Sequence, residues 1–302
     1  MKKVKIKIPA KLNLTLDVTG RKDGYHVLDS LFVSVNVCDE IVVKERKDEG
    51  IRLSFLRKKI IPRNKKTCAY AEISPEKTNA YRAAEAYITT FGTSGADITV
   101  KRKIPTGGGL GGSSADAAGV LVALSRLYGY GKNDENGELT DIVNTLGSDG
   151  AFLLRGGLCR VRGRGTDVQP IPTDVKLYFL IVAGERNGDT AKCFKLYDER
   201  GTVYAPCTEE ALGKLSGGDE KGFCSVIKND LFEAANALNG EISRNLEALR
   251  RYGGAVMTGS GSAVFALFFD KKSRDKAFRG LKKRFGKRLL RAESLSGDIF
   301  RR

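Results

Sequence analysis

The chain has 302 residues, of which 41% are hydrophobic and 29% charged, and its formal net charge is +16. This composition excludes an intrinsically disordered protein, and no apolar segment approaches the length of a membrane span. The positive charge predicts acidic ligands or partners. The six cysteines form no Cys-x-x-Cys pair and there is one histidine, so we expect reduced thiols in a cytoplasmic protein, not a disulfide framework or a zinc site.

The first half of the chain predicts strands and helices in mixed order. Lysines alternate with apolar residues over 4–8, which is typical of a strand and not of a signal peptide. The other expected strands are 12–16, parts of 31–45, and 96–104, with a turn at 20–24. The expected helices are 79–91, 113–128 and 139–146, and an apolar hairpin is expected at 152–161. This order excludes a Rossmann sheet and a barrel.

The second half predicts a separate layer of helices on an antiparallel sheet. Pro170 and Pro172 indicate a boundary between two domains, 1–170 and 171–302. Beyond it, the expected strands are 177–182, 262–269 and 289–294. The expected helices are 192–198, 207–215, 219–235, 241–251 and 273–283. The predicted class is therefore α+β.

Residues 105–118 read Pro-Thr-Gly-Gly-Gly-Leu-Gly-Gly-Ser-Ser-Ala-Asp-Ala-Ala. Such a density of glycine predicts a backbone with positive φ angles or a close approach to a ligand. We expect Ser113, Ser114 and Asp116 to cap the following helix, whose unpaired first-turn N–H groups then form an anion site. The alternative is a flexible loop before an ordinary helix. The segment is neither a Walker A motif nor a protein-kinase loop.

Three further segments accompany the glycine loop. They are Pro9-Ala10-Lys11-Leu12-Asn13-Leu14, Gly147-Ser148-Asp149 and Met257-Thr258-Gly259-Ser260-Gly261-Ser262-Ala263-Val264-Phe265. With the loop, and in this order, they resemble the GHMP kinase superfamily over nearly the whole chain. The resemblance implies two domains, the first sharing its fold with a ribosomal protein domain and the second ferredoxin-like. It also implies ATP and Mg²⁺, and phosphoryl transfer to a small-molecule hydroxyl.

The resemblance implies roles for individual residues. The ATP-binding residues that it implies are Pro105, Gly107, Gly108, Gly109, Leu110, Gly111, Gly112, Ser113 and Ser114, with the two serines as Mg²⁺ ligands. Asp149 is the implied base for the acceptor hydroxyl, and Lys11 beside it would keep the carboxylate ionised. The alternatives are a turn cap for Asp149 and a charge on an edge strand for Lys11.

The segment Gly20-Arg21-Lys22-Asp23-Gly24-Tyr25-His26 resembles the signature of GHMP kinases whose acceptor carries cytidine diphosphate, in non-mevalonate isoprenoid biosynthesis. The resemblance implies that Tyr25 and His26 recognise the cytosine, because a wrong base would leave buried polar groups unpaired. The other substrate-binding residues that it implies are Asn13, Thr190, Gly259, Ser260 and Gly261.

Two alternatives stay open. One is a GHMP kinase that acts on homoserine, mevalonate or a sugar, against which the segment around His26 argues. The other is a basic RNA-binding protein, for which the clusters 58–66 and 282–291 would form the binding surface. The clusters contain one aromatic residue, Phe285, and the chain has no recognised nucleic-acid motif, so we expect no specific nucleic-acid partner. We also expect no membrane partner, and a monomer or homodimer.

The chain departs from the family pattern in three places. Gly-Gly-Ser113-Ser114-Ala115-Asp116 stands where the family usually has Gly-Gly-Gly-Ser-Ser-Asp. Asp149-Gly150-Ala151-Phe152 lacks the proline of the usual Asp-Val-Pro-Phe, and Ser262 stands where proline is frequent. None of these differences removes a charge from the implied chemistry.

Overall fold

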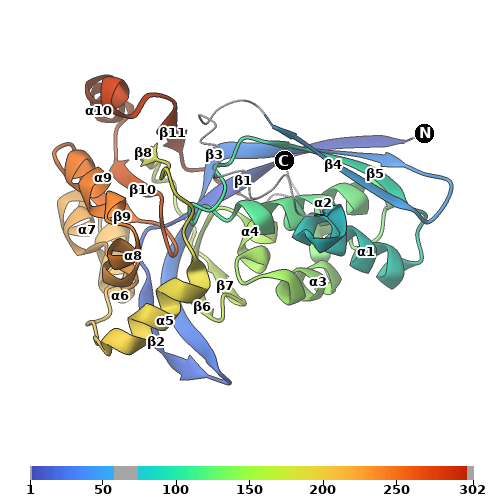
Figure 1. Cartoon of the computed structure of the whole chain (residues 1–302), viewed down its shortest axis with the longest axis horizontal. Coiled ribbons are helices and arrows are strands. Elements are labelled where there is room, and N and C mark those ends of the chain that lie inside the picture. The colour runs from blue at the N-terminus through green and yellow to red at the C-terminus, as the bar shows by residue number, and fades with distance from the viewer. Residues whose placement is uncertain (1, 58–73, 298–302) are drawn as a thin grey trace.

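The structure is a computed structural model that describes residues 2–57 and 74–297. The basic cluster 58–66 and Cys68 lie outside the described residues. Figure 1 shows two β-sheets with their helices, α1 to α4 on one side of the molecule and α8 to α10 on the other, while the β2–β3 hairpin extends below α5. Among the described helices, none has the length and apolar character that a membrane span needs.

The first sheet is organised around one long strand, β3. Its strands are β1 (Lys3–Asn13), β2 (Asp17–Lys22), β3 (Tyr25–Glu45), β4 (Ile51–Arg57), β5 (Ala96–Arg102), β6 (Leu158–Gly163) and β7 (Asp167–Pro170). The path runs β4-β5-β3-β6-β7, and β1 and β2 also pair with β3. Only β4 and β5 pair in parallel among these strands of the described chain. The 21 residues of β3 allow it to bind β2 and β6 near its start and β1 and β5 further along.

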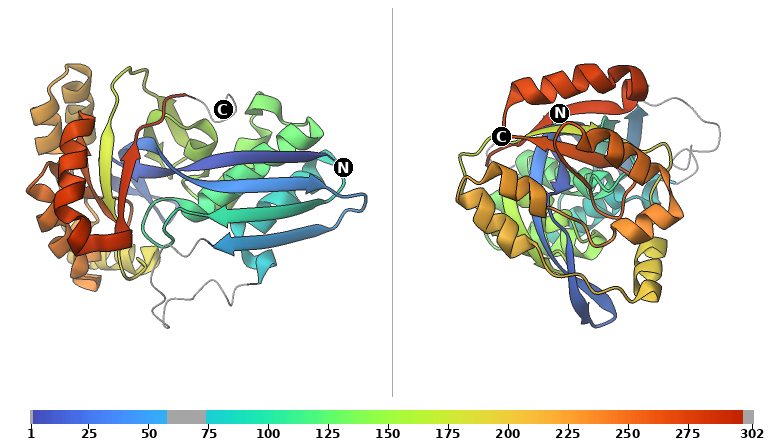
Figure 2. Two further views of the ribbon diagram at one scale, coloured as in Figure 1. Left: turned by 90° about the horizontal axis from the view of Figure 1, so that it is seen from above. Right: turned by 90° about the vertical axis from the view of Figure 1, so that its left-hand side faces the viewer.

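One face of this sheet is covered by helices (Figure 2). They are α1 (Asn79–Phe91), α2 (Gly112–Tyr128), α3 (Glu138–Leu146) and α4 (Gly150–Arg155). Along β1, Ile6 and Ile8 are buried in the core, whereas Lys5 and Lys7 are exposed, as the alternation predicts. The strand continues through Pro9 because the pairing with β3 shifts register there, and such an irregularity is where a strand accommodates proline.

The second sheet contains β8 (Tyr178–Val182), β9 (Gly254–Met257), β10 (Val264–Phe268) and β11 (Leu289–Glu293). Its order is β11-β8-β10-β9 with antiparallel pairs throughout, which is the ferredoxin-like order that the resemblance implies. The helices around it are α5 (Thr190–Arg200), α6 (Thr208–Ser216), α7 (Glu220–Val226), α8 (Phe232–Leu238), α9 (Glu241–Arg250) and α10 (Lys271–Phe285). The α+β class is confirmed. The domain limits 1–170 and 171–302 stay a prediction.

Two expected elements are wrong, and several strands were not expected. The hairpin at 152–161 is a helix, α4, followed by β6, because a short apolar run does not distinguish a buried helix from a strand. The helix at 219–235 is two helices, separated where the Leu16 backbone N–H bonds the Lys228 carbonyl. The strands that were not expected are β2, which occupies part of the expected turn at 20–24, β4, β7 and β9. Strand β9 lies directly before residues 258–261, the late glycine turn.

The expected caps of α2 are also wrong. The helix begins after Gly111, whose φ of 74° is the left-handed conformation, and no side chain caps it. Asp116 is instead buried, and its Oδ2 accepts hydrogen bonds from Arg102 Nε and Nη2 at 3.0 and 2.7 Å. Nearby, Asp39 Oδ1 accepts the backbone N–H groups of Lys103 and Ile104, which lead into the glycine loop. Buried carboxyl groups therefore support the base of the loop.

The buried carboxyl of Asp116 predicts that stability depends on pH. Burial raises its pKa from 3.8 to about 7, and the nearby Asp39 adds to the rise against the opposing charge of Arg102. The folded chain then binds more protons than the unfolded chain between these values, so the free energy of unfolding falls as the pH rises from about 4 to about 7. We expect Asp116→Asn, which keeps an oxygen for Arg102, to flatten this fall. Urea unfolding at several pH values measures the free energy of unfolding of both proteins. An equal fall with pH in the wild type and in Asp116→Asn would contradict the prediction.

Candidate active site

A cavity of about 360 Å³ brings together most of the predicted site residues. Those that line it are Lys11, Asn13, Tyr25, His26, Gly109, Ser114, Asp149, Thr190, Gly259 and Ser260. The others lie in the same loop and turn without lining it, namely Pro105, Gly107, Gly108, Leu110, Gly111, Gly112, Ser113 and Gly261. A larger cavity of about 530 Å³, around 155–158, 170–177 and 294–297, contains none of the predicted residues.

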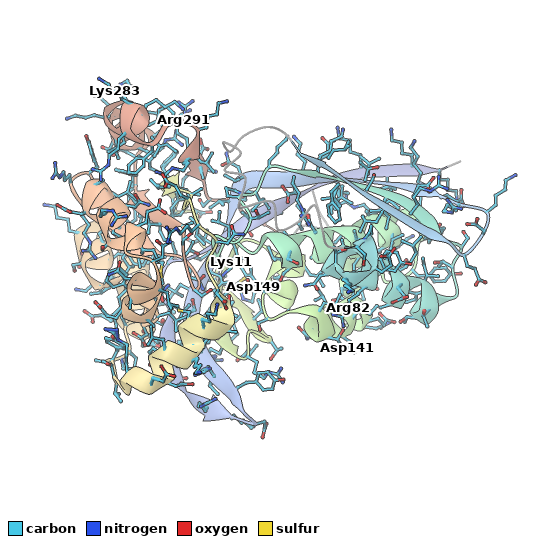
Figure 3. All side chains as sticks on the ribbon, in the orientation of Figure 1. Lys11, Arg82, Asp141, Asp149, Lys283 and Arg291 are labelled. Carbon is cyan, nitrogen blue, oxygen red and sulfur yellow. The ribbon has the colours of Figure 1, made fainter. Side chains whose placement is uncertain are left out.

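Lys11 and Asp149 both line the cavity, and Figure 3 shows them close together. Lys11 is near the end of β1, and its side chain is 4% exposed, with Nζ 3.5 Å from Asp149 Oδ2. Nζ also donates to Asn13 Oδ1 at 2.7 Å and lies 4.7 Å from the centre of the Phe32 ring. A buried lysine with these partners argues against the alternative of an edge-strand charge, which suits the exposed lysines at the start of β1.

Asp149 immediately precedes α4, but its side chain makes no capping hydrogen bond. Its side chain is 26% exposed, so the carboxylate is accessible from the cavity. The capping alternative is therefore not supported. The departure at Gly150 has a local reason, because a Cβ there would come within 2.4 Å of Val143 Cγ2 on α3. The backbone after Asp149 packs too closely on α3 for the family's valine.

The glycine loop packs against the late turn of the second sheet. Gly109 has a φ of 74°, and a Cβ on it would lie 2.2 Å from the Thr258 carbonyl oxygen. The carbonyls of Gly107 and Gly108 accept the backbone N–H groups of Gly188 and Ala263 at 2.7 and 3.2 Å. Glycine is thus required where the two sheets meet at the cavity. The hydroxyl of Ser262, at the third departure from the family, donates to the Arg186 carbonyl.

Asn13 has internal partners for its side-chain amide. Its Oδ1 accepts from Lys11 Nζ, from the Gly259 N–H at 2.9 Å and from Thr258 Oγ1 at 3.2 Å. Its Nδ2 donates to Ser30 Oγ at 3.1 Å. Asn13 therefore connects Lys11 to the late glycine turn, a role that the sequence did not indicate. Its predicted contact with the substrate stays a prediction.

The other end of the cavity is lined by aromatic residues that come from distant parts of the chain. Figure 1 shows α5 beside the β2–β3 hairpin that carries Tyr25 and His26. The His26 ring stacks on Phe194 with centroids 4.4 Å apart, and its Nε2 lies 2.7 Å from Asp198 Oδ1. The Arg164 guanidinium lies 3.4 Å from the centre of the Tyr25 ring.

Phe194, Asp198 and Arg164 were missed from the sequence. The spacing of Phe194 and Asp198, four residues apart on the expected helix 192–198, places them on one helix face and is the signal that was available. On the same helix, the predicted Thr190 lies at the start, with its Oγ1 2.7 Å from Ser260 Oγ. One face of α5 therefore completes the cavity from the second half of the chain.

The oxygen-bearing side chains at the cavity could hold Mg²⁺ only together with further oxygen ligands, such as substrate phosphates. Ser114 lines the cavity, whereas Ser113 is exposed outside it. Among the residues that the structure describes, no group of three or more His, Cys, Asp or Glu side chains could hold a metal ion. Mg²⁺ prefers oxygen ligands and is commonly held by one or two protein groups plus substrate phosphates. The Ser114 hydroxyl fits that arrangement better than Ser113.

The basic cluster 282–291 is partly neutralised. Arg288 Nη1 lies 2.6 Å from Glu241 Oε1, and its Nη2 lies 3.0 Å from Glu185 Oε1. Arg291 pairs more loosely with Asp275, at 3.6 Å. Figure 3 shows Lys283 and Arg291 around α10, far from Lys11 and Asp149. This surface is therefore separate from the cavity, and the expected lack of a nucleic-acid partner stays a prediction.

Two family models match the chain. The one described as GHMP kinases N terminal domain matches residues 78–157, and the one described as GHMP kinases C terminal matches residues 201–287. Together they span more than half of the chain. The chain belongs to the GHMP kinase family. This GHMP kinase is accordingly an ATP-dependent phosphotransferase, and the resemblance inferred from the four segments is confirmed.

Two curated relatives of this GHMP kinase share one name. It is 34% identical to the 4-diphosphocytidyl-2-C-methyl-D-erythritol kinase of Desulfitobacterium hafniense (strain Y51) over 267 residues, which cover 85% of this chain and 84% of the relative. It is 28% identical to the enzyme of that name from Bacillus cereus (strain AH187), over 93% of each chain. Among GHMP kinases, the chain groups with these enzymes.

Solved structures agree with this grouping. A crystal structure of 4-(cytidine 5'-diphospho)-2C-methyl-D-erythritol kinase matches with a TM-score of 0.76 at 28% identity, over 97% of this chain and 100% of the other. A homoserine kinase from Cytophaga hutchinsonii matches with a TM-score of 0.73 at 20% identity, over 99% of this chain and 96% of the other. The second likeness shows the fold alone, and the expected two-domain GHMP kinase fold is confirmed.

Proposed function

We propose that this GHMP kinase phosphorylates the 2-hydroxyl of 4-diphosphocytidyl-2-C-methyl-D-erythritol with ATP, in non-mevalonate isoprenoid precursor biosynthesis. The names of the relatives support this acceptor. The observation that carries the proposal is one cavity with the Lys11–Asp149 pair, 3.5 Å apart, and with Tyr25 and His26. A base–cation pair and a polar aromatic subsite are what a kinase for a nucleotide-linked alcohol requires.

The proposed chemistry is a single in-line transfer. Asp149 accepts the proton of the acceptor hydroxyl while that oxygen forms a bond to the γ-phosphorus of ATP. The bond between the γ-phosphorus and the bridging oxygen breaks, and its electron pair leaves with ADP. The cation of Lys11 stabilises the Asp149 carboxylate and the hydroxyl oxygen as charge develops. Because positioning and charge stabilisation account for most catalysis of this kind, these two side chains, the glycine loop and a bound Mg²⁺ would be sufficient.

Several finer assignments belong to the same proposal. The N–H groups at the start of α2 and the loop from Pro105 to Gly112 would bind the ATP phosphates, since the helix start is free of side-chain caps. Ser114 would supply a hydroxyl ligand to Mg²⁺, which when bound neutralises phosphate charge. We also propose a cytoplasmic enzyme that acts as a monomer or homodimer.

The test is ATP turnover by the purified protein with Mg²⁺ and different acceptors. We expect ADP release to be stimulated by 4-diphosphocytidyl-2-C-methyl-D-erythritol and not by homoserine, mevalonate or galactose. The position of the phosphate in the product, determined by ³¹P NMR, tests transfer to the 2-hydroxyl. Stimulation by one of the other acceptors alone would reject the proposed acceptor while the kinase assignment stands.

A further inference from the structure

Asp198 joins α5 to both strands of the β2–β3 hairpin at the aromatic end of the cavity. Its Oδ1 lies 2.7 Å from His26 Nε2, and its Oδ2 lies 3.3 Å from Arg21 Nη1. Arg21 and His26 are direct partners across the hairpin. A single carboxylate thus holds a side chain from each strand, although 172 residues separate it from His26.

The contact with Asp198 determines which nitrogen of His26 carries the proton. An ionised carboxylate only accepts hydrogen bonds, so the bond to Nε2 requires a proton on that nitrogen. In the neutral ring, Nδ1 then has a lone pair and acts as an acceptor. Within the described part of the chain, Nδ1 takes part in no hydrogen bond. Nδ1 is therefore available to accept a hydrogen bond from a ligand.

Other contacts fix the plane of the ring. Phe194 stacks on it at 4.4 Å, and Tyr197 meets it edge-on with centroids 6.2 Å apart. The side chain is only 12% exposed, and His26 lines the cavity. Rotation of the imidazole by half a turn would put the carbons Cε1 and Cδ2 where Nε2 and Nδ1 lie, and the bond from Nε2 to Asp198 opposes that rotation. Orientation and proton position are consequently set by the same carboxylate.

We propose that Asp198 is a positioning residue that holds His26 with its proton on Nε2. Nδ1 then accepts a hydrogen bond from the exocyclic amino group of the cytosine in the substrate. This inference rests on the proposed function. On its base-pairing edge, cytosine has one donor, the amino group, whereas uracil has a carbonyl oxygen in that position. The lone pair on Nδ1 therefore forms a hydrogen bond with the amino group of cytosine and repels the carbonyl oxygen of uracil. Asp198 is then a determinant of base specificity.

The sole histidine of the chain allows a direct spectroscopic test. In protein without a histidine tag, ¹⁵N NMR of the imidazole at pH 7.5 is expected to show the Nε2–H form. Asp198→Ala is expected to convert it into a mixture of the two neutral forms. A wild-type ring with its proton on Nδ1, or an unaltered spectrum in Asp198→Ala, would overturn the proposal. This readout needs no acceptor, so its outcome is independent of the proposed reaction.

Kinetics test the consequence for specificity. Asp198→Ala is expected to raise the KM for the cytidine acceptor about tenfold and to lower its preference over the uridine analogue by a similar factor. The KM for ATP is expected to stay unchanged. Asp198→Asn should retain most of the preference, because its amide oxygen still accepts from Nε2. Unchanged preference in Asp198→Ala would overturn the proposed role even if the cytidine acceptor is the substrate.

A matched control lies next to Asp198 on the same helix. Glu199 is an exposed carboxylate whose ion pair is with Lys195 at 3.9 Å, away from His26. Glu199→Ala is expected to leave the ¹⁵N spectrum, the acceptor KM and the base preference as in the wild type. Thermal unfolding of each variant checks that it is folded, and Asp198→Asn keeps the proposal testable if Asp198→Ala is not. A change in Glu199→Ala as large as that in Asp198→Ala would attribute the effect to surface charge and overturn the proposal.

Discussion

Asp149→Asn is expected to lower kcat by about 10²- to 10⁴-fold, the usual contribution of a positioned general base. Asparagine has nearly the same shape but does not accept the proton of the acceptor hydroxyl. The acceptor KM is expected to change little, because the proposed contacts with the cytosine of the acceptor lie at the other end of the cavity. Steady-state kinetics with saturating ATP and Mg²⁺ measure both constants.

The same substitution is expected to leave the fold nearly intact. The Asp149 side chain makes no capping hydrogen bond and is partly exposed, so the free energy of unfolding should change by about 1 kcal/mol or less. Asp141→Asn is the matched control, since Asp141 is an exposed carboxylate on α3 whose side chain lies away from the Lys11–Asp149 pair in Figure 3. Turnover within threefold of the wild type in folded Asp149→Asn would remove Asp149 from the role of base.

Lys11→Met is expected to lower kcat by about 10²- to 10³-fold, the range found when one preorganised group that stabilises transition-state charge is removed. Methionine retains an unbranched apolar chain, which would keep the packing of the Lys11 stem against Gly111 and Phe32. It removes the cation 3.5 Å from Asp149 and the donor to Asn13 Oδ1. Kinetics with both substrates varied separate this loss from a change in binding.

Lys7→Met is the control for Lys11→Met. Both lysines belong to β1, but Lys7 is exposed and does not line the cavity. Its replacement is expected to leave kcat and both KM values within twofold of the wild type. If the two variants lost activity equally, the effect would belong to the net charge of the strand and not to the pair with Asp149.

The start of β1 and two helices of the first half follow from local pattern. The alternation of lysine and isoleucine at the start of β1 buries Ile6 and Ile8 because successive side chains point to opposite faces of a strand. The helices 79–91 and 113–128 lie within one residue of their predicted bounds, since each is a long segment with helical periodicity that ends before a glycine. Longer periodic segments contain enough repeats to identify the element on their own.

Shorter and interrupted segments depended on their surroundings. The apolar run of α4 is compatible with a strand or a helix, and packing on α2 and α3 selects the helix. The break between α7 and α8 has no glycine or proline within 227–231, and it coincides with hydrogen bonds to Leu16 from a distant part of the chain. Local preference is weak over so few residues, and contacts with other elements override it.

The candidate site divides in the same way. The sequence by itself determined the family, the glycine loop, and Lys11 and Asp149 as a candidate pair, because these depend on residue types in short contiguous motifs. Only the tertiary structure decided that Asn13 connects Lys11 to Gly259 and that Asp198 holds His26. Those contacts join residues far apart in the chain, and they form because two separately predicted sheets pack their ends around one cavity.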